Sequence, residues 1–266
     1  MLVLCSIFRF SYSISMKEFV TKLDNVDEFR KILKNYQPSK TLLLKLRSIK
    51  FVLLSAPTAS GRNTIIHTLS RGGDYRYIVS DTTRSPRVNN GAIEKNGVEY
   101  WFNSEHQFLK GLMAGDYLEA AVIHNQQVSG INGKEFNIAS QASQFAITDI
   151  DVHGCDTIVG YSDTILPLFI LPPKFGIWMK RLQKRGKMPK DEKRRRIYSA
   201  IEEISLALQR SYFYFITNDD LELTSNTIHR FVSGDLESLP DQEEQKKHAR
   251  QLILELKKSI SAQDFN

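Results

Sequence analysis

Short apolar runs recur along the chain and alternate with stretches in which apolar residues return every three or four positions. The runs predict strands over residues 50–55, 75–80, 145–150, 166–171 and 212–217. The helical spacing predicts helices over residues 62–70, 104–113, 134–143, 174–185, 191–209 and 221–231. Because strands and helices alternate, we predict an α/β fold with a mostly parallel central sheet.

Residues 81–130 interrupt this alternation. Turn-forming residues are frequent in 81–96, and short strand-like pieces follow at 100–103 and 117–123. This pattern predicts a small mixed or antiparallel insert over one end of the central sheet.

The two ends of the chain predict helical extensions. Residues 17–45 have the spacing of one or two amphipathic helices, broken at Pro38, and 242–261 have the spacing of one more. Residues 1–15 are apolar and Ser-rich, with one arginine and no acidic residue. A targeting peptide is one interpretation, although a basic start and a clear cleavage site are missing. We favour a start at Met16 or a short disordered tail.

Composition narrows the classes of protein. The 266 residues are 41% hydrophobic and 25% charged, which is typical of a globular protein in water. The net charge of +6 is concentrated around 180–196, and because no nucleic-acid-binding motif accompanies it, we expect free nucleotides rather than nucleic acid as partners. The two cysteines form no C-x-x-C pair, which favours a reducing, cytoplasmic location. No apolar run is long enough to cross a bilayer, so we expect no membrane partner.

A loop of small residues lies between the first strand and the next helix. Residues 56–64 read Ala-Pro-Thr-Ala-Ser-Gly-Arg-Asn-Thr. In the phosphate-loop pattern G-x-x-x-x-G-K-[ST], Gly61 alone agrees, while Arg62 stands at the lysine and Asn63 at the hydroxyl position. The loop by itself is equally compatible with an ordinary strand–turn–helix corner.

Six further motifs follow the loop in order. They occupy residues 80–87, 97–102, 117–119, 148–154, 181–186 and 217–221. In this order and spacing they resemble the guanylate kinase family over about residues 50–232. The resemblance implies the three-layer P-loop fold, with transfer of a phosphoryl group from ATP to GMP.

The resemblance also implies an organisation of the chain. Residues 1–49 would be an N-terminal extension and 50–232 the kinase-like domain, with its core in 50–80 and 144–232. The GMP-binding insert would be 81–130, the helical lid 173–196, and the charged helical tail 233–266. A monomer or a homodimer is expected.

On the donor side, the resemblance implies binding of ATP with Mg²⁺ as cofactor. The expected ATP-binding residues are Ala56, Pro57, Thr58, Ala59, Ser60, Gly61, Arg62, Asn63, Thr64 and Asn218. Asn63 and Asp149 would bind the metal, mainly through water. The expected catalytic cations are Arg62, Arg181, Arg185 and Arg196, since phosphoryl transfer depends on positioning and on neutralising charge.

On the acceptor side, the resemblance implies a GMP site. Its expected residues are Ser80, Arg84, Arg87, Glu94, Tyr100, Glu119, Ser129 and Asp151. The sequence departs from the family at Ala120, at Val128 and in a longer segment over 88–93. Three alternatives therefore stay open: a guanylate kinase-like binding module of little or no activity, a kinase with another acceptor, and a nucleic-acid binder that uses the basic lid.

Overall fold

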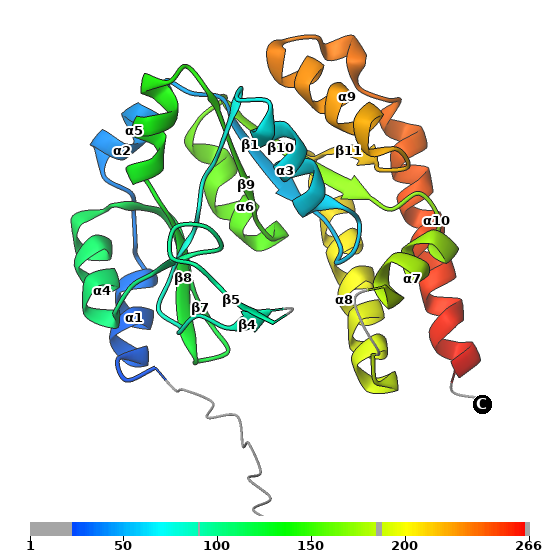
Figure 1. The fold of residues 1–266 in the computed structure, drawn as a ribbon, viewed down its shortest axis with the longest axis horizontal. Helices are drawn as coiled ribbons and strands as arrows, with labels where there is room; N and C mark the ends of the chain where they lie inside the picture. Colours follow the sequence, from blue (N-terminus) through cyan, green and yellow to red (C-terminus); the bar gives the residue numbers. More distant parts are fainter. Residues whose placement is uncertain (1–22, 90, 185–187, 264–266) are drawn as a thin grey trace, which may run out of the picture.

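The structure is a computed structural model that describes residues 23–89, 91–184 and 188–263. A five-stranded sheet forms its centre, in the order β11-β10-β1-β9-β2 (Figure 1). Every pairing in this sheet is parallel. The strands are β1 (Phe51–Ser55), β2 (Tyr75–Tyr77), β9 (Phe145–Asp149), β10 (Ile165–Leu171) and β11 (Tyr214–Thr217). The predicted α/β fold and parallel sheet are confirmed.

Helices cover both faces of the sheet, which makes three layers. Val52 and Leu54 of β1 face α3 (Arg62–Arg71) and α9 (Leu221–Ser233) within one apolar core. Phe51 and Leu53 belong to the core on the other face. That core includes α5 (Lys134–Gln141), α6 (Val152–Ile158), α7 (Phe175–Gln183) and α8 (Lys190–Leu208). Side chains of a strand alternate between faces, so a continuously apolar strand is buried on both.

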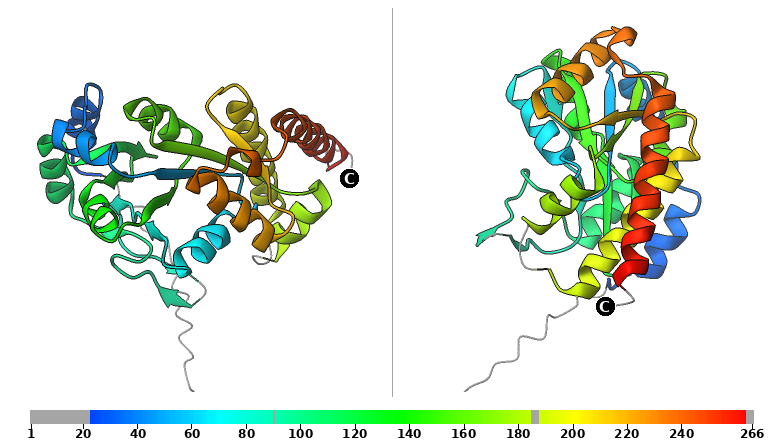
Figure 2. Two further views of the ribbon diagram at one scale, coloured as in Figure 1. Left: turned by 90° about the horizontal axis from the view of Figure 1, so that it is seen from above. Right: turned by 90° about the vertical axis from the view of Figure 1, so that its right-hand side faces the viewer.

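The insert has a second sheet, of order β6-β3-β8-β7. Its strands are β3 (Asp81–Thr82), β6 (Trp101–Phe102), β7 (Tyr117–Ile123) and β8 (Gln127–Asn132), with α4 (Glu105–Ala114) beside them. The β3–β6 pair is parallel and the others are antiparallel, so the sheet is mixed. A two-stranded hairpin, β4 (Val88–Asn89) with β5 (Ala92–Ile93), projects from the insert (Figure 2).

The helices near the two ends pack on opposite parts of the molecule. On one side, α1 (Val26–Leu33) contacts α4 and β7, while α2 (Lys40–Leu46) begins after Pro38 with Ser39 as its cap. On the other, α10 (Gln242–Gln263) packs against α8 and β11 (Figure 1). Two short turns of 3-10 helix, η1 (Val159–Tyr161) and η2 (Leu236–Ser238), complete the described elements. The predictions for residues 1–15 lie outside the described residues.

None of the described helices has both the length and the apolar character that crossing a bilayer requires.

Candidate active site

The loop between β1 and α3 has the shape of an anion-binding loop. Gly61 lies in the left-handed region with φ 96°, and Ala59 lies there too with φ 66°. A β-carbon on Gly61 would lie 2.1 Å from Nδ2 of Asn218, so the position requires glycine. The loop leads directly into α3, with Thr64 in its first turn. The backbone N–H groups of a helix start attract anions.

Asn218 fastens this loop from the carboxyl end of β11. Its Nδ2 donates to the carbonyl oxygen of Ser60 at 2.8 Å, and the side chain is buried. Its Oδ1 is buried too and has no hydrogen-bond partner among the described residues. The predicted donor residue Asn218 is therefore held against the loop, with an unused acceptor.

Arg62 at the start of α3 is paired with Asp149 at the end of β9. Its NH2 lies 2.9 Å from Oδ2 of Asp149. The other carboxylate oxygen, Oδ1, accepts a hydrogen bond from the Tyr77 hydroxyl at 2.7 Å. Burial and the Asp149 charge raise the pKa of Tyr77 well above its ordinary value. The side chain predicted to bind donor phosphates thus neutralises the carboxylate predicted to bind metal.

The predicted metal position offers two oxygen donors, Asp149 and Asn63. Within 23–89, 91–184 and 188–263, no group of three or more His, Cys, Asp or Glu side chains is placed to hold a metal ion. Mg²⁺ in nucleotide enzymes is commonly bound by one or two protein oxygens together with phosphate oxygens. The donor set therefore fits Mg²⁺ that arrives with a nucleotide.

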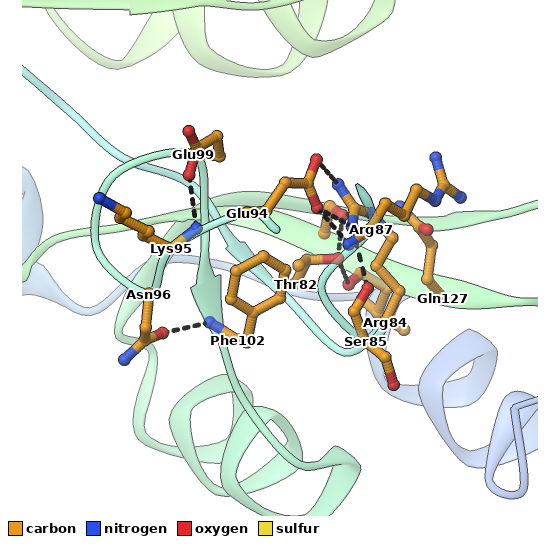
Figure 3. Close-up of polar contacts among 12 residues, drawn as sticks. Thr82, Arg84, Ser85, Arg87, Glu94, Lys95, Asn96, Glu99, Phe102 and Gln127 are labelled. Atoms are coloured by element: carbon orange, nitrogen blue, oxygen red, sulfur yellow. Dashed lines mark hydrogen bonds and ion pairs between the residues drawn. The ribbon is translucent and has the colours of Figure 1, made fainter. Parts of the chain in front are cut away.

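A buried ion pair organises the acceptor side (Figure 3). Arg84 binds Glu94 through both terminal nitrogens, and the side chains are 8% and 6% exposed. Glu94 also accepts the backbone N–H of Arg87 at 2.9 Å. Arg84 holds the pKa of Glu94 below its ordinary value. The β4–β5 hairpin spans the longer segment 88–93 and returns the chain so that Glu94 meets both arginines.

Two aromatic rings border the Arg84 guanidinium, which lies 4.7 Å from the centre of the Tyr100 ring and 5.6 Å from that of Phe102. Arg87, by contrast, has an exposed side chain. Arg84 is thus a fixed anchor of the turn, while Arg87 is the more accessible cation.

One cleft of about 700 Å³ takes lining residues from both the donor and the acceptor side, but Arg62, Arg84, Arg87 and Glu119 are not among them. Asn63 and Asp149 line it from the donor side, and Glu94 and Tyr100 line it from the acceptor side. Tyr77 lines it as well. Residues from four separate segments therefore face one shared space.

The predicted base-reading residues have different surroundings. Glu119 on β7 lies within electrostatic reach of Asp151, and burial together with that charge raises the pKa of Glu119 to about 8. Asp151 caps α6 by accepting the N–H of Gly154 at 2.7 Å. Ser129 is engaged inside the insert sheet, where its hydroxyl donates to Thr82 at 2.9 Å. The backbone carbonyl of Ser80 accepts the N–H of Trp101 at 2.9 Å.

Two predicted lid arginines contact residues of the donor side. Arg181 of α7 donates to the backbone carbonyl of Asn218 at 3.1 Å. Arg196 of α8 donates to the hydroxyl of Thr58 at 3.3 Å and pairs with Glu192 at 2.8 Å. The third, Arg185, lies outside the described residues.

Sequence reasoning did not find Tyr77 or Glu203. Glu203 on α8 is half-buried, which raises its pKa, while the nearby charge of Arg62 acts in the opposite direction. No motif marks either residue. Tyr77 could have been found from topology, because it and Asp149 lie at the carboxyl ends of neighbouring parallel strands, where ligands of open α/β sheets bind.

Comparison with known proteins gives consistent matches. Residues 48–235 match the family model described as guanylate kinase. The guanylate kinase of Corynebacterium diphtheriae is 30% identical over 187 residues, covering 70% of this chain and 95% of the relative. That of Bacteroides fragilis is 33% identical over 180 residues, covering 67% and 85%.

A solved structure shows the same fold. The crystal structure of guanylate kinase from Anaplasma phagocytophilum matches with a TM-score of 0.50 at 22% identity, covering 79% of this chain and 90% of that one.

Proposed function

The chain belongs to the guanylate kinase family of phosphotransferases, and we propose that the described cleft is where the γ-phosphoryl group of ATP passes to GMP, giving ADP and GDP. The observation that carries this proposal is the cleft of about 700 Å³, whose lining includes the phosphate-loop residue Asn63 and the carboxylate Asp149 as well as Tyr100 and Glu94. Phosphoryl transfer requires the two nucleotides to meet in line with water excluded.

The donor triphosphate would lie on residues 56–64. The N–H groups of the loop and of the α3 start would hold its oxygens. Arg196 already contacts Thr58 of the loop, Arg181 contacts the backbone of Asn218, and both would neutralise charge on the transferred group. The free Oδ1 of Asn218 would accept a donor group of the nucleotide base, which removes the unfavourable burial of an unpaired oxygen.

Arg62 would change partners when the donor binds. Here its guanidinium lies on Asp149. Phosphate oxygens offer this guanidinium bidentate, charge-assisted hydrogen bonds. Arg62 would then turn to the phosphates and leave Asp149 available, with Asn63, to hold Mg²⁺ through water. The metal, when bound, supplies charge neutralisation on the donor phosphates.

GMP would bind with its phosphate at the Arg84–Glu94 turn. Exposed Arg87 and the Tyr100 hydroxyl would contact the phosphate, while Arg84 keeps the turn in shape. Glu119 would read guanine, because an ionised carboxylate accepts both the N1–H and the exocyclic amine. Asp151 would stand beside it.

The direct test identifies the phosphorylated products by ³¹P NMR. The full chain with ATP, Mg²⁺ and GMP should form ADP and GDP in equal amounts by ³¹P NMR. Asp149→Asn should abolish turnover and leave GMP binding intact, since Asp149 lies on the donor side. Formation of ADP and inorganic phosphate without GDP would contradict the proposal.

A further inference from the structure

Ala59 holds an unusual conformation inside the phosphate loop. Its φ of 66° is left-handed, and the residue is buried. A residue with a β-carbon is less stable there than in the right-handed region, and such positions persist only where surrounding contacts hold them. The contacts that hold Ala59 should therefore matter for the shape of the loop.

The Thr58–Ala59 and Ser60–Gly61 peptide groups are fixed from outside the loop, while the peptide between them is held inside it by the Ser60 N–H, which donates to the Pro57 carbonyl oxygen at 3.1 Å. The indole Nε1 of Trp178, on α7, donates to the Thr58 carbonyl oxygen at 2.7 Å. Asn218 donates to the Ser60 carbonyl at 2.8 Å. In a trans peptide the carbonyl and the following N–H point in opposite directions. These two bonds therefore direct the N–H groups of Ala59 and Gly61 away from Trp178 and Asn218.

Trp178 itself has no room to move. It is 2% exposed, and its neighbours include Phe175, Pro57 and the α10 residues Leu252 and Leu256. The space left among these side chains is about 10 Å³, no more than a single water would fill. The indole is therefore a rigid donor.

The C-terminal helix takes part in this arrangement. His248 of α10 bonds the Pro172 carbonyl at 2.9 Å, just before α7 begins. Helix α10 lies beyond the segment 48–235 that matches the family. A part of the chain outside the matched domain thus supports the helix that carries Trp178.

We propose that Trp178 is a positioning residue for the donor nucleotide: its bond to Thr58 keeps Ala59 left-handed and so aims the loop N–H groups at phosphate oxygens. The identity of the ligand rests on the proposed function. The geometry of the loop does not.

Two substitutions test this coupling. Trp178→Phe keeps most of the ring and removes the N–H, and it should weaken ADP binding about fivefold, the worth of one hydrogen bond. Adding Ala59→Gly should restore affinity to within about twofold of the starting protein, because glycine adopts the left-handed region without a supporting bond. GMP affinity should stay unchanged in both variants.

Two matched controls accompany them. Ala56→Gly makes the same change in the same loop at a position that is not left-handed, so it should not restore binding in Trp178→Phe. Trp101→Phe removes another indole N–H, which donates to Glu135 of α5 at 3.1 Å, and should leave ADP affinity unchanged.

The measurement is calorimetric titration of the full chain and each variant with ADP and, separately, GMP. Selective loss for ADP with recovery through Ala59→Gly supports the proposal. Unchanged ADP affinity in Trp178→Phe, equal loss for both nucleotides, or no recovery with Ala59→Gly would overturn it. Because no turnover is measured, a chain that binds ADP and lacks kinase activity would contradict the proposed function alone.

Discussion

Replacing Arg84 by alanine should lower the folding stability of the protein. The substitution removes the partner of a carboxylate that is 6% exposed and binds Arg84 through both oxygens. The bond that Glu94 accepts from the Arg87 N–H would remain. Breaking a buried ion pair by removing one partner costs about 3–5 kcal/mol, because the remaining charge stays buried. For a domain of this size that lowers the unfolding midpoint by roughly 6–20 °C.

Thermal and urea unfolding of Arg84→Ala measure this loss. The exposed pair Arg230–Asp235 provides a matched control, since Arg230→Ala should cost less than about 1 kcal/mol. The double variant Arg84→Ala with Glu94→Ala should recover part of the loss, because it leaves no buried charge behind. An unfolding midpoint for Arg84→Ala within 2 °C of the starting protein would refute the reasoning.

The same pair gives stability a pH dependence of known sign. The pKa of Glu94 is lowered on folding, chiefly by the Arg84 hydrogen bonds. Its contribution is therefore complete above the ordinary carboxyl pKa and is lost as pH falls through the lowered value. Glu94→Gln should make unfolding free energy less sensitive to acid. An unchanged acid dependence would contradict this assignment.

Three further predictions concern Arg62 at the donor phosphates, the recognition of guanine by Glu119, and the packing of helix α10. Arg62→Ala should lower kcat by about 10²–10³ in a coupled ADP-release assay, since it removes one cation from the transferred group; full activity would exclude that role. GMP affinity, measured by calorimetry, should strengthen by up to about tenfold per pH unit between pH 6.5 and 8, because Glu119 with its raised pKa must lose a proton to accept guanine donors. Glu119→Gln should remove this dependence of GMP affinity on pH. Leu252→Ala, at a 2% exposed position of α10, should cost about 2–5 kcal/mol in urea unfolding. Leu254→Ala, at a 53% exposed position, should stay within about 0.5 kcal/mol, and equal losses would mean that α10 is not packed as described.

The central sheet could be predicted because its strands are continuous apolar runs. Phe51 to Leu54 are fully buried, and because both faces of the strand are covered, every position in it is apolar. The insert was harder, because β3 to β6 are two residues each, and β3 and β6 depend on pairing with strands distant in the sequence. Two residues are too few to show the alternation of apolar and polar positions that identifies a strand.

The site was predictable to the extent that its residues sit in ordered motifs. Asp149 ends an apolar run and could be placed at a strand end, and Gly61 could be placed at the start of the helix that follows the first strand, both from sequence alone. Contacts between distant segments could not. Arg62 and Asp149 are 87 positions apart, and the Trp178 indole reaches a carbonyl 120 positions earlier. Such pairings are set by the packing of helices on the sheet, and a local sequence pattern does not predict that packing.

The most direct test of the kinase assignment is a coupled ADP-release assay on the full chain with ATP, Mg²⁺ and each nucleoside monophosphate in turn. We predict that ADP forms with GMP at a rate well above that with AMP, CMP or UMP. Turnover with another monophosphate in preference to GMP would contradict the assigned acceptor. Absence of turnover with every acceptor, with GMP still bound in calorimetry, would show a nucleotide-binding module in place of a kinase.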